Sequence, residues 1–411
     1  MVLNVLICGG GCAGPSLAFW LARAGHRVTV VERFPALRAS GAQIDLRAQG
    51  IQVAKRMGII DAVRSKVVDE DGIAWVDQNG TDRAKIMANK SGKGAQTMTS
   101  EFEIMRGDLV RILYDVTKND VEYIFGISVD RFEQDEKSVT AYFSDGSSGT
   151  YDILVGADGQ GSRIRKAILP QDDDPVRHIG MYIAHWLVPT VASDDKFARG
   201  LHLPGGRLIM TRSHSPVESQ ACFIMRQDSE ELRSIPRASI EKQKEFWVSK
   251  FNDAGWVAPR LIEGMDSSEY FYSQEIVQIR TDTWFKGRVA LLADAAHCPS
   301  PMTGMGTTSA LVGSYVLAGE IVQNADNLEI AFANYDKTLR PFINDIQWLP
   351  TWMLPIAIPG TQWGINLLHF VTGWISYLRI PELAARFSKE EKGGWVLPEY
   401  PLLHKTAERG E

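Results

Sequence analysis

The chain has 411 residues, of which 45% are hydrophobic and 23% are charged, and its formal net charge at pH 7 is -6. This length is sufficient for two closely joined domains around a large core. The acidic balance argues against a nucleic-acid-binding protein, because such proteins carry a basic surface. The four cysteines are scattered without CxxC spacing, so we expect neither disulfides nor a metal site. Because Met1 leads directly into an apolar strand without a signal peptide, we expect a cytoplasmic protein.

A glycine-rich turn near the N-terminus is the strongest local signal. A short apolar strand runs into the pattern Gly-x-Gly-x-x-Gly at Gly9, Gly11 and Gly14, and helix-like sequence follows. In such a turn the first glycine permits a sharp bend, the second lets a pyrophosphate approach, and the third allows close packing of helix on strand. A second strand ends at Glu32, near the ~20-residue spacing expected of a carboxylate that binds ribose hydroxyls. The stretch predicts a dinucleotide-binding unit.

Two later apolar strands also end in an acid. The first runs into Gly-Ala-Asp-Gly, in which Asp158 is followed by Ser162 and Arg165. The second runs into Ala-Asp-Ala-Ala-His, which contains Asp294 and precedes a glycine-containing loop and an apolar helix. Acids at strand ends can reach sugar hydroxyls, and a helix N-terminus can bind phosphate. Each acid could instead cap the helix that follows it.

The texture of the chain changes to alternating strands in its middle third, which predicts an inserted antiparallel sheet. Residues 91–99 are small and polar and predict a loop. We therefore expect an α/β fold in which a nucleotide-binding domain is interrupted by a sheet domain and followed by a helical tail. The expected parts are 1–174 and 279–341 for the nucleotide-binding domain, 175–278 for the substrate sheet and 342–411 for the tail.

The tail has an unusual composition between residues 346 and 378, where there is no Lys, Arg, Asp or Glu and there are four tryptophans. Three prolines break its first half, and residues 361–378 have the polar spacing of an amphipathic helix. A spanning helix needs ~20 unbroken apolar residues, which the prolines do not allow over the whole segment. We favour a helix packed over the substrate domain. Weak contact with a membrane surface and a homodimer interface are the alternatives, so the protein is expected to be a monomer or a homodimer.

The three acid- and glycine-containing motifs, in this order, resemble those of the group A flavoprotein monooxygenases, the single-component FAD enzymes of the para-hydroxybenzoate hydroxylase type. The chain looks most like the branch that contains the tetracycline-inactivating monooxygenases. The resemblance covers residues 1 to about 341, ending at Tyr335-Asp-x-x-x-Arg340-Pro341. It implies a Rossmann-type FAD-binding domain with an inserted antiparallel-sheet substrate domain.

This resemblance implies an enzyme that uses FAD, with NAD(P)H as a transient co-substrate, and O2 to insert one oxygen atom into an apolar or aromatic small molecule. A polyketide, a terpenoid or a tetracycline-like compound is expected, in secondary metabolism or detoxification, by hydroxylation, epoxidation or Baeyer–Villiger insertion. No catalytic side chain is assigned, because the cofactor carries the chemistry. The residues that it assigns to FAD are Gly9, Gly11, Ala13, Gly14, Glu32, Arg33, Arg38, Arg106, Val129 (through its backbone), Asp158, Asp294, Gly304, Gly306 and Thr307.

Some positions depart from the family pattern or have a second interpretation. Ala293 stands where the family usually has glycine, and Thr308 stands where it often has asparagine. Arg38 and Arg47 could be solvated loop charges. His297, beside the third motif, is expected to pack in the structure rather than to react.

Candidates for the substrate wall come from the inserted sheet. In the strand at 181–188, odd-numbered and even-numbered residues must lie on opposite faces, but the sequence does not say which face meets the flavin. We select His185, Arg207, Met210 and Phe223 as candidates, each of which could also be an ordinary sheet residue. Two other functions stay open: a reductase, dehydrogenase or cyclase on the same scaffold that does not use O2, and a nucleotide-sensing module.

Overall fold

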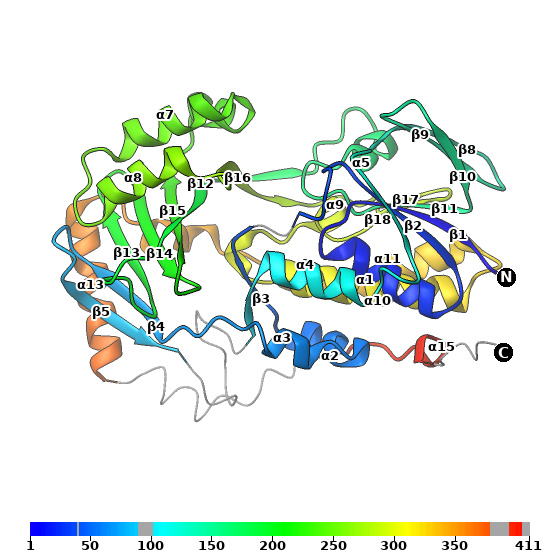
Figure 1. Ribbon diagram of the computed structural model, residues 1–411, viewed down its shortest axis with the longest axis horizontal. Helices are drawn as coiled ribbons and strands as arrows, with labels where there is room; N and C mark the ends of the chain where they lie inside the picture. Colours follow the sequence, from blue (N-terminus) through cyan, green and yellow to red (C-terminus); the bar gives the residue numbers. More distant parts are fainter. Residues whose placement is uncertain (39–40, 89–101, 379–393, 405–411) are drawn as a thin grey trace.

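The structure is a computed structural model and describes residues 1–38, 41–88, 102–378 and 394–404, so the predicted loop at 91–99 lies outside the described residues. Figure 1 shows two lobes joined side by side, one built around a largely parallel sheet and the other around a larger, mostly antiparallel sheet. This arrangement confirms the α/β fold with a second sheet domain that the sequence predicts.

The first lobe has a six-stranded sheet in the order β17-β18-β11-β1-β2-β7. Its strands come from distant parts of the chain: β1 (Asn4–Cys8), β2 (Arg27–Glu32), β7 (Glu122–Phe125), β11 (Ile153–Gly156), β17 (Phe285–Lys286) and β18 (Val289–Leu291). All neighbours pair in parallel except the edge strand β17. The three strands that precede the predicted motifs, β1, β11 and β18, lie next to one another. Parallel strands place their carboxyl ends at one edge of the sheet, so the three motifs meet there.

Helices pack against this sheet. They include α1 (Ala13–Arg23), α4 (Arg106–Asp115), α10 (Gly306–Gln323) and α11 (Leu328–Ile346). Fourteen of the residues of α10 are buried, which explains why the sequence of this helix is apolar on all sides. A smaller three-stranded sheet of β8 (Val129–Gln134), β9 (Val139–Phe143) and β10 (Ser148–Tyr151) flanks the lobe.

The second lobe has a seven-stranded sheet in the order β16-β12-β15-β14-β13-β4-β5. Five strands lie in or next to the predicted insertion: β12 (Val176–Pro189), β13 (Phe197–Leu203), β14 (Arg207–Ser213), β15 (Glu218–Arg226) and β16 (Tyr272–Ile279). The other two, β4 (Gly72–Val76) and β5 (Asp82–Met87), come from the part that we assigned to the nucleotide-binding domain. The expected boundary at residue 175 is therefore wrong for this hairpin, because the fully buried β4 pairs in parallel with β13.

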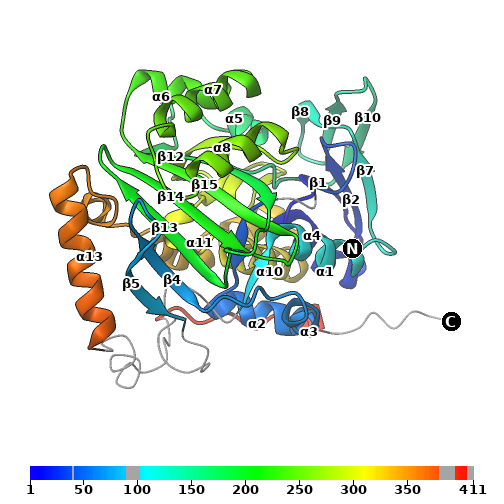
Figure 2. The same ribbon diagram turned by 60° about the vertical axis from the view of Figure 1, so that its left-hand side comes forward.

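One face of this sheet is covered by α7 (Ile240–Phe251) and α8 (Ala258–Ser267), as Figure 2 shows. The even-numbered side chains of β12, such as Tyr182 and Trp186, join the hydrophobic cluster formed with these helices. The odd-numbered side chains therefore lie on the opposite face, where β3 (Gln43–Asp45) of the first lobe meets the sheet through side-chain hydrogen bonds. The structure thus resolves which face is turned toward the nucleotide-binding lobe.

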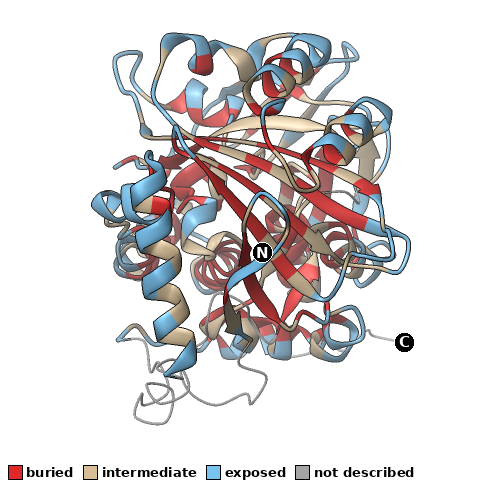
Figure 3. Ribbon diagram, turned by 90° about the vertical axis from the view of Figure 1, so that its left-hand side faces the viewer, coloured by how far each residue is buried: buried red, intermediate tan, exposed pale blue. Residues whose placement is uncertain are grey.

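The tail first follows the second lobe and then returns to the first. The predicted amphipathic helix is α13 (Gln362–Tyr377), which packs along β5 and β13 with one side and exposes the other, as Figure 3 shows. Its exposed aromatic side chains include Trp363, Phe370 and Tyr377. Residues 394–404, by contrast, lie against the first lobe, where Tyr400 is buried. Among the described residues, no helix combines the length and apolarity needed to cross a membrane.

Candidate functional site

The glycine turn follows β1 and is closed to side chains. Gly9 has a φ of +120°, and a Cβ added to it would lie 2.3 Å from the carbonyl oxygen of Ala157. A Cβ on Gly14 would lie 2.0 Å from the carbonyl oxygen of Gly9. The turn therefore needs glycine at both positions, and it brings the N-terminus of α1, which begins at Ala13, to the edge of the sheet.

Glu32 lies at the end of β2, directly beside this turn. Its carboxylate accepts hydrogen bonds from the backbone N–H groups of Gly10 at 2.7 Å and Phe34 at 3.1 Å. Two backbone donors therefore hold the acid at the position where a ribose would lie along the turn. Val129, at the start of the flanking sheet, is buried, and it follows Ile127, whose N–H donates to the carbonyl oxygen of Glu32.

Three arginines gather beside the turn. The Arg106 guanidinium lies 3.3 Å from a Cβ built on Gly11, and it donates to the carbonyl oxygen of Arg38 at 3.5 Å. Arg33 and Arg38 lie over the ring of Phe34, 5.1 and 4.8 Å from its centroid. Burial and the positive charges of Arg106 and Arg33 lower the pKa of Arg38. Such a cluster of cations next to a helix N-terminus suits a bound pyrophosphate.

Asp158 has the capping role that the sequence left open. Its carboxylate accepts from the Ser162 hydroxyl at 2.6 Å and from the Arg163 N–H at 2.8 Å, at the start of α5 (Arg163–Ile168). The buried Arg165 in this helix donates to the carbonyl oxygen of Ala295 at 3.0 Å. The second and third motifs are thus joined directly. A contact of Asp158 with the cofactor stays a prediction.

Asp294 opens the short helix α9 (Asp294–His297) and is half-buried, and this burial raises the pKa of its carboxyl while the charges of Arg106 and Arg165 oppose the shift. The preceding Ala293 has a φ of +53°, in the region that favours glycine. This strain explains why related sequences place glycine there. His297 is buried, with its ring nitrogens 3.2 Å from the Ser309 hydroxyl and 3.4 Å from the Tyr335 hydroxyl, in the packed position that we expected.

The loop before α10 completes the frame. A Cβ on Gly304 would lie 3.2 Å from a carboxylate oxygen of Asp45, whereas a Cβ on Gly306 would meet no atom within 4 Å. Gly306 and Thr307 form the first turn of α10, so free N–H groups point from an 18-residue helix into this open space. The Thr308 hydroxyl binds the backbone of Arg47, accepting from its N–H at 3.0 Å and donating to its carbonyl oxygen at 3.1 Å. The glycines, arginines and helix N-termini together fit the phosphates and the polar ring edge of FAD.

The sheet face opposite this frame carries a row of side chains in register. Tyr272, His185, Cys222 and Met210 pair across β16, β12, β15 and β14. The rings of His185 and Tyr272 stack with centroids 5.2 Å apart. Burial lowers the pKa of His185 to about 4, so the imidazole is neutral at physiological pH. Two of the four substrate candidates, His185 and Met210, therefore lie on the face turned toward the predicted cofactor site.

The other two candidates are on the wrong side of the sheet. Phe223 is fully buried between Trp186 and Phe251, with ring centroids 4.8 and 4.2 Å away. Arg207 forms an ion pair with Asp253 at 2.6 Å, at the end of α7. Because α7 and α8 cover this face, neither side chain can line a site that faces the first lobe.

Sequence reasoning missed a buried charged group on the functional face. Arg212 of β14 binds Glu70 at 2.7 Å and Glu103 at 2.8 Å, and both carboxylates are almost fully buried. Burial raises the pKa of Glu103 to about 7, although the charge of Arg212 opposes the shift. The available signal was the two-residue spacing from Met210, which places Arg212 on the same face.

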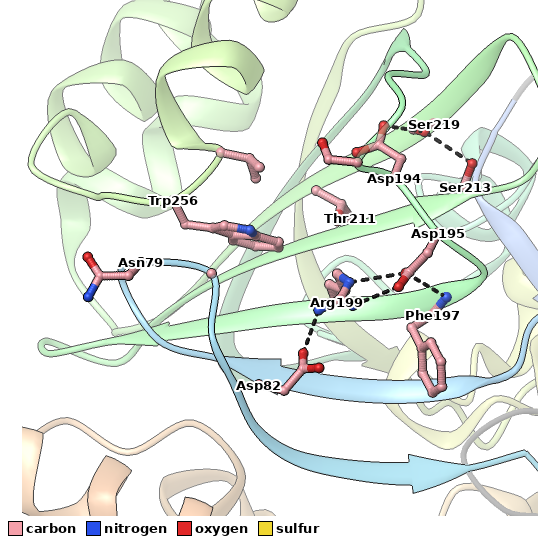
Figure 4. A pocket seen from close by; sticks show the side chains of 13 residues that line it. Asn79, Asp82, Asp194, Asp195, Phe197, Arg199, Thr211, Ser213, Ser219 and Trp256 are labelled. Atoms are coloured by element: carbon pink, nitrogen blue, oxygen red, sulfur yellow. Dashed lines mark hydrogen bonds and ion pairs between the residues drawn. The ribbon is translucent and has the colours of Figure 1, made fainter.

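A hollow of about 350 Å³ lies on the helix-covered side of the sheet. Figure 4 shows Trp256 on one side of it, and Arg199 between Asp82 and Asp195, which it contacts at 2.6 Å each. None of the residues that the sequence assigned to FAD or to the substrate lines it. Its charged groups pair with one another and lie apart from the frame described above.

The fold and the frame define a flavoprotein, and comparison with known proteins agrees. Residues 2–324 match the family described as the FAD binding domain, and the chain belongs to this family. It is 38% identical to the FAD-dependent monooxygenase asL4 of Sarocladium schorii, over 98% of this chain and 99% of that protein. It is 39% identical to the flavin-dependent monooxygenase eupH of a Phoma species, over 90% and 91%.

Among solved structures, the tetracycline destructase Tet(51) superposes with a TM-score of 0.80 and 29% identity, covering 97% of this chain and 99% of that one. The protein is thus an FAD-dependent monooxygenase of group A, in the branch that contains the tetracycline-inactivating enzymes. This confirms the resemblance found in the sequence.

Proposed function

We propose that this protein is a single-component monooxygenase that takes electrons from NAD(P)H and inserts one oxygen atom of O2 into an apolar or aromatic small molecule. We place the substrate between the FAD-binding frame and the seven-stranded sheet. The row from Tyr272 through His185 to Met210 carries this proposal, because it presents an aromatic and weakly polar wall opposite the N-terminus of α10. The likeness to tetracycline destructases supports a polycyclic substrate such as a polyketide or a terpenoid.

In this proposal FAD, when bound, supplies the hydride acceptor and the oxygen activation. The glycine turn and the cluster of Arg33, Arg38 and Arg106 hold the pyrophosphate, and Glu32 holds the ribose. The N–H groups of Gly306 and Thr307 stabilise negative charge on the flavin ring. The sheet excludes water and orients the substrate. No side chain is required as a nucleophile.

Stopped-flow absorbance tests oxygen activation without knowledge of the substrate. Reduced, FAD-loaded protein is mixed with oxygenated buffer, and we expect a transient near-ultraviolet absorbance distinct from that of oxidised FAD. Incubation with NADPH or NADH, tetracycline and 18O2 should then place one labelled oxygen in the product. Direct reoxidation without a transient, or a product formed without label, would favour a reductase, dehydrogenase or cyclase.

The exposed side of α13 supports a weak contact with a membrane surface or a second copy of the chain. Trp363, Phe370, Trp374 and Tyr377 are all more than half exposed there. Exposed tryptophan and tyrosine are typical of proteins that touch lipid headgroups. Sedimentation with phosphatidylcholine vesicles and size-exclusion chromatography separate the two outcomes, and a monomer that stays in solution would exclude both.

A further inference from the structure

Two buried polar atoms lack a partner where the sheet meets the first lobe. They are the side-chain nitrogen Nε2 of Gln43, in β3, and the ring nitrogen Nδ1 of His185, in β12. Gln43 is 9% exposed and His185 is 1% exposed. An unpaired buried polar group costs about 1–3 kcal/mol, so a folded protein that keeps two of them close together is expected to use them.

The hydrogen bonds around Gln220 decide which atom donates and which accepts. The backbone N–H of Gln43 can act only as a donor, and it binds Oε1 of Gln220 at 2.9 Å. That oxygen is therefore an acceptor, so His185 Nε2, 3.3 Å away, must carry the ring proton. His185 Nδ1 is then a bare acceptor. Gln220 Nε2 donates to Gln43 Oε1 at 3.1 Å, which leaves the Gln43 Nε2 amide as a free donor.

These atoms lie between the predicted cofactor frame and the substrate wall. Gln43 is two residues before Asp45, whose carboxylate is next to Gly304, and it pairs in β3–β6 register with Met105, the neighbour of Arg106. On the other side, His185 stacks on Tyr272 in the row described above. The chain Gln43–Gln220–His185 thus connects the two walls of the proposed substrate site.

Other buried histidines show the contrast. Both ring nitrogens of His202 have partners, namely His369 at 3.2 Å and the carbonyl oxygen of Ala357 at 3.0 Å. Both ring nitrogens of His297 also have partners. His185 is equally buried but has an open acceptor, although it lies on a strand whose neighbours could have supplied a hydroxyl group.

We propose that Gln43 and His185 form a donor–acceptor pair that anchors the substrate, with His185 Nδ1 accepting from a substrate hydroxyl group and Gln43 Nε2 donating to a substrate carbonyl oxygen. The substrate class is then an aromatic or conjugated ketone that carries a free hydroxyl group. This inference rests on the proposed function, because it takes the space between the two walls as the substrate site. A site that holds a hydroxyl group with a buried acceptor discriminates strongly against an analogue that lacks it.

Binding of small probes tests the pair. The 2′-, 3′- and 4′-hydroxyacetophenones and their methyl ethers are titrated into FAD-loaded protein, and dissociation constants are taken from the change in flavin absorbance. We expect at least one hydroxyl isomer to bind about tenfold more tightly than its own methyl ether. Equal affinities within every pair, including no binding by either member, would overturn the proposal.

Variants assign the discrimination to named atoms. His185→Gln can keep the bond to Gln220 through its amide nitrogen but has no acceptor at the Nδ1 position, so the tenfold preference should disappear. His185→Asn places an amide oxygen near that position and should keep part of the preference. Gln43→Met should weaken both members of each pair by a similar factor. The control, His202→Gln, should bind all probes as the wild type does. A preference that persists in His185→Gln would contradict the assignment.

Two further readouts separate this proposal from its alternatives. If Gln43→Met loses FAD or shifts the flavin spectrum without a probe, the amide serves the cofactor and the pair is wrong. The near-ultraviolet transient with O2 should be unchanged in His185→Gln, because oxygen activation does not depend on the anchor. Probe discrimination in a protein without that transient would support the anchor and contradict the monooxygenase function, whereas the reverse result would contradict the anchor alone.

Discussion

The two faces of the seven-stranded sheet are built from the same strands but have opposite compositions. On the face toward α7 and α8, Trp186, Phe223 and Phe251 pack ring against ring and are fully buried. On the face toward the FAD-binding lobe, His185 and Arg212 are surrounded by polar groups. The alternation of a strand thus supplies stability on one side and chemistry on the other. A substitution should therefore affect folding or ligand binding according to its face.

The largest effect is expected from Phe223→Ala. Removing a buried phenylalanine ring costs about 3–5 kcal/mol, because a cavity remains. Urea unfolding should show this loss, while flavin content and probe affinity per folded molecule stay unchanged. The control is Cys222→Ala, one residue away on the opposite face, which should cost less than about 1.5 kcal/mol. A change in probe affinity without lost stability would place Phe223 in the site after all.

Arg212→Met should come next, with a loss of about 3 kcal/mol, because Glu70 and Glu103 would remain buried without their cation. The control is Arg199→Met, which breaks two ion pairs nearer the surface and should cost less than about 1 kcal/mol. Both variants are compared by urea unfolding at pH 7.5. Equal losses would mean that burial does not distinguish the two faces.

Glu103→Gln makes the polar face sensitive to pH in a defined direction. Because burial raises the pKa of Glu103 from 4.5 to about 7, the folded protein holds this proton more tightly than the unfolded chain. Its contribution to stability is present below pH 4.5 and is lost as the pH rises to about 7. The variant should match the wild type at pH 5 and exceed it by on the order of 2 kcal/mol at pH 7.5. A wild type that gains on the variant as the pH rises would show that the ion pair with Arg212 outweighs burial.

The smallest effect is expected outside both faces and calibrates the comparison. Ala293→Gly removes a side chain at a φ of +53° and should raise the free energy of unfolding by about 1 kcal/mol. Probe affinities should not change. A thermal melt that shows destabilisation would mean that the methyl group contributes packing worth more than the strain.

The parts of the site that depend on local chain geometry could be predicted from the sequence. Gly9, Gly14 and Glu32 follow from one strand–turn–helix–strand unit, and the structure brings them together. Phe223 and Arg207 were misplaced because the face of a strand that meets the cofactor is decided by where distant helices pack. The pairing of β4 with β13 joins residues more than a hundred positions apart, and no local pattern encodes such a contact.

The pair formed by Gln43 and His185 could not be predicted for a related reason. Neither residue belongs to a motif, and their relation exists only through Gln220 on a third element. Asp158 shows the opposite limit, since the same residue can cap a helix and belong to a family motif. Its hydrogen bonds to Ser162 and Arg163 show the capping role but do not test the other.

The C-terminal segment 394–404 has a consequence for how the protein is made. The ring of Tyr400 fills the space beside Gly319 in α10, and its hydroxyl group donates to Glu320 at 2.7 Å. The lobe that leaves the ribosome first is therefore completed by residues that leave last. Its core can close only after synthesis has ended, since domains normally begin to fold as they emerge. A ribosome that stops a few codons early would release a chain whose first domain is unfinished, and that chain would be open to proteolysis.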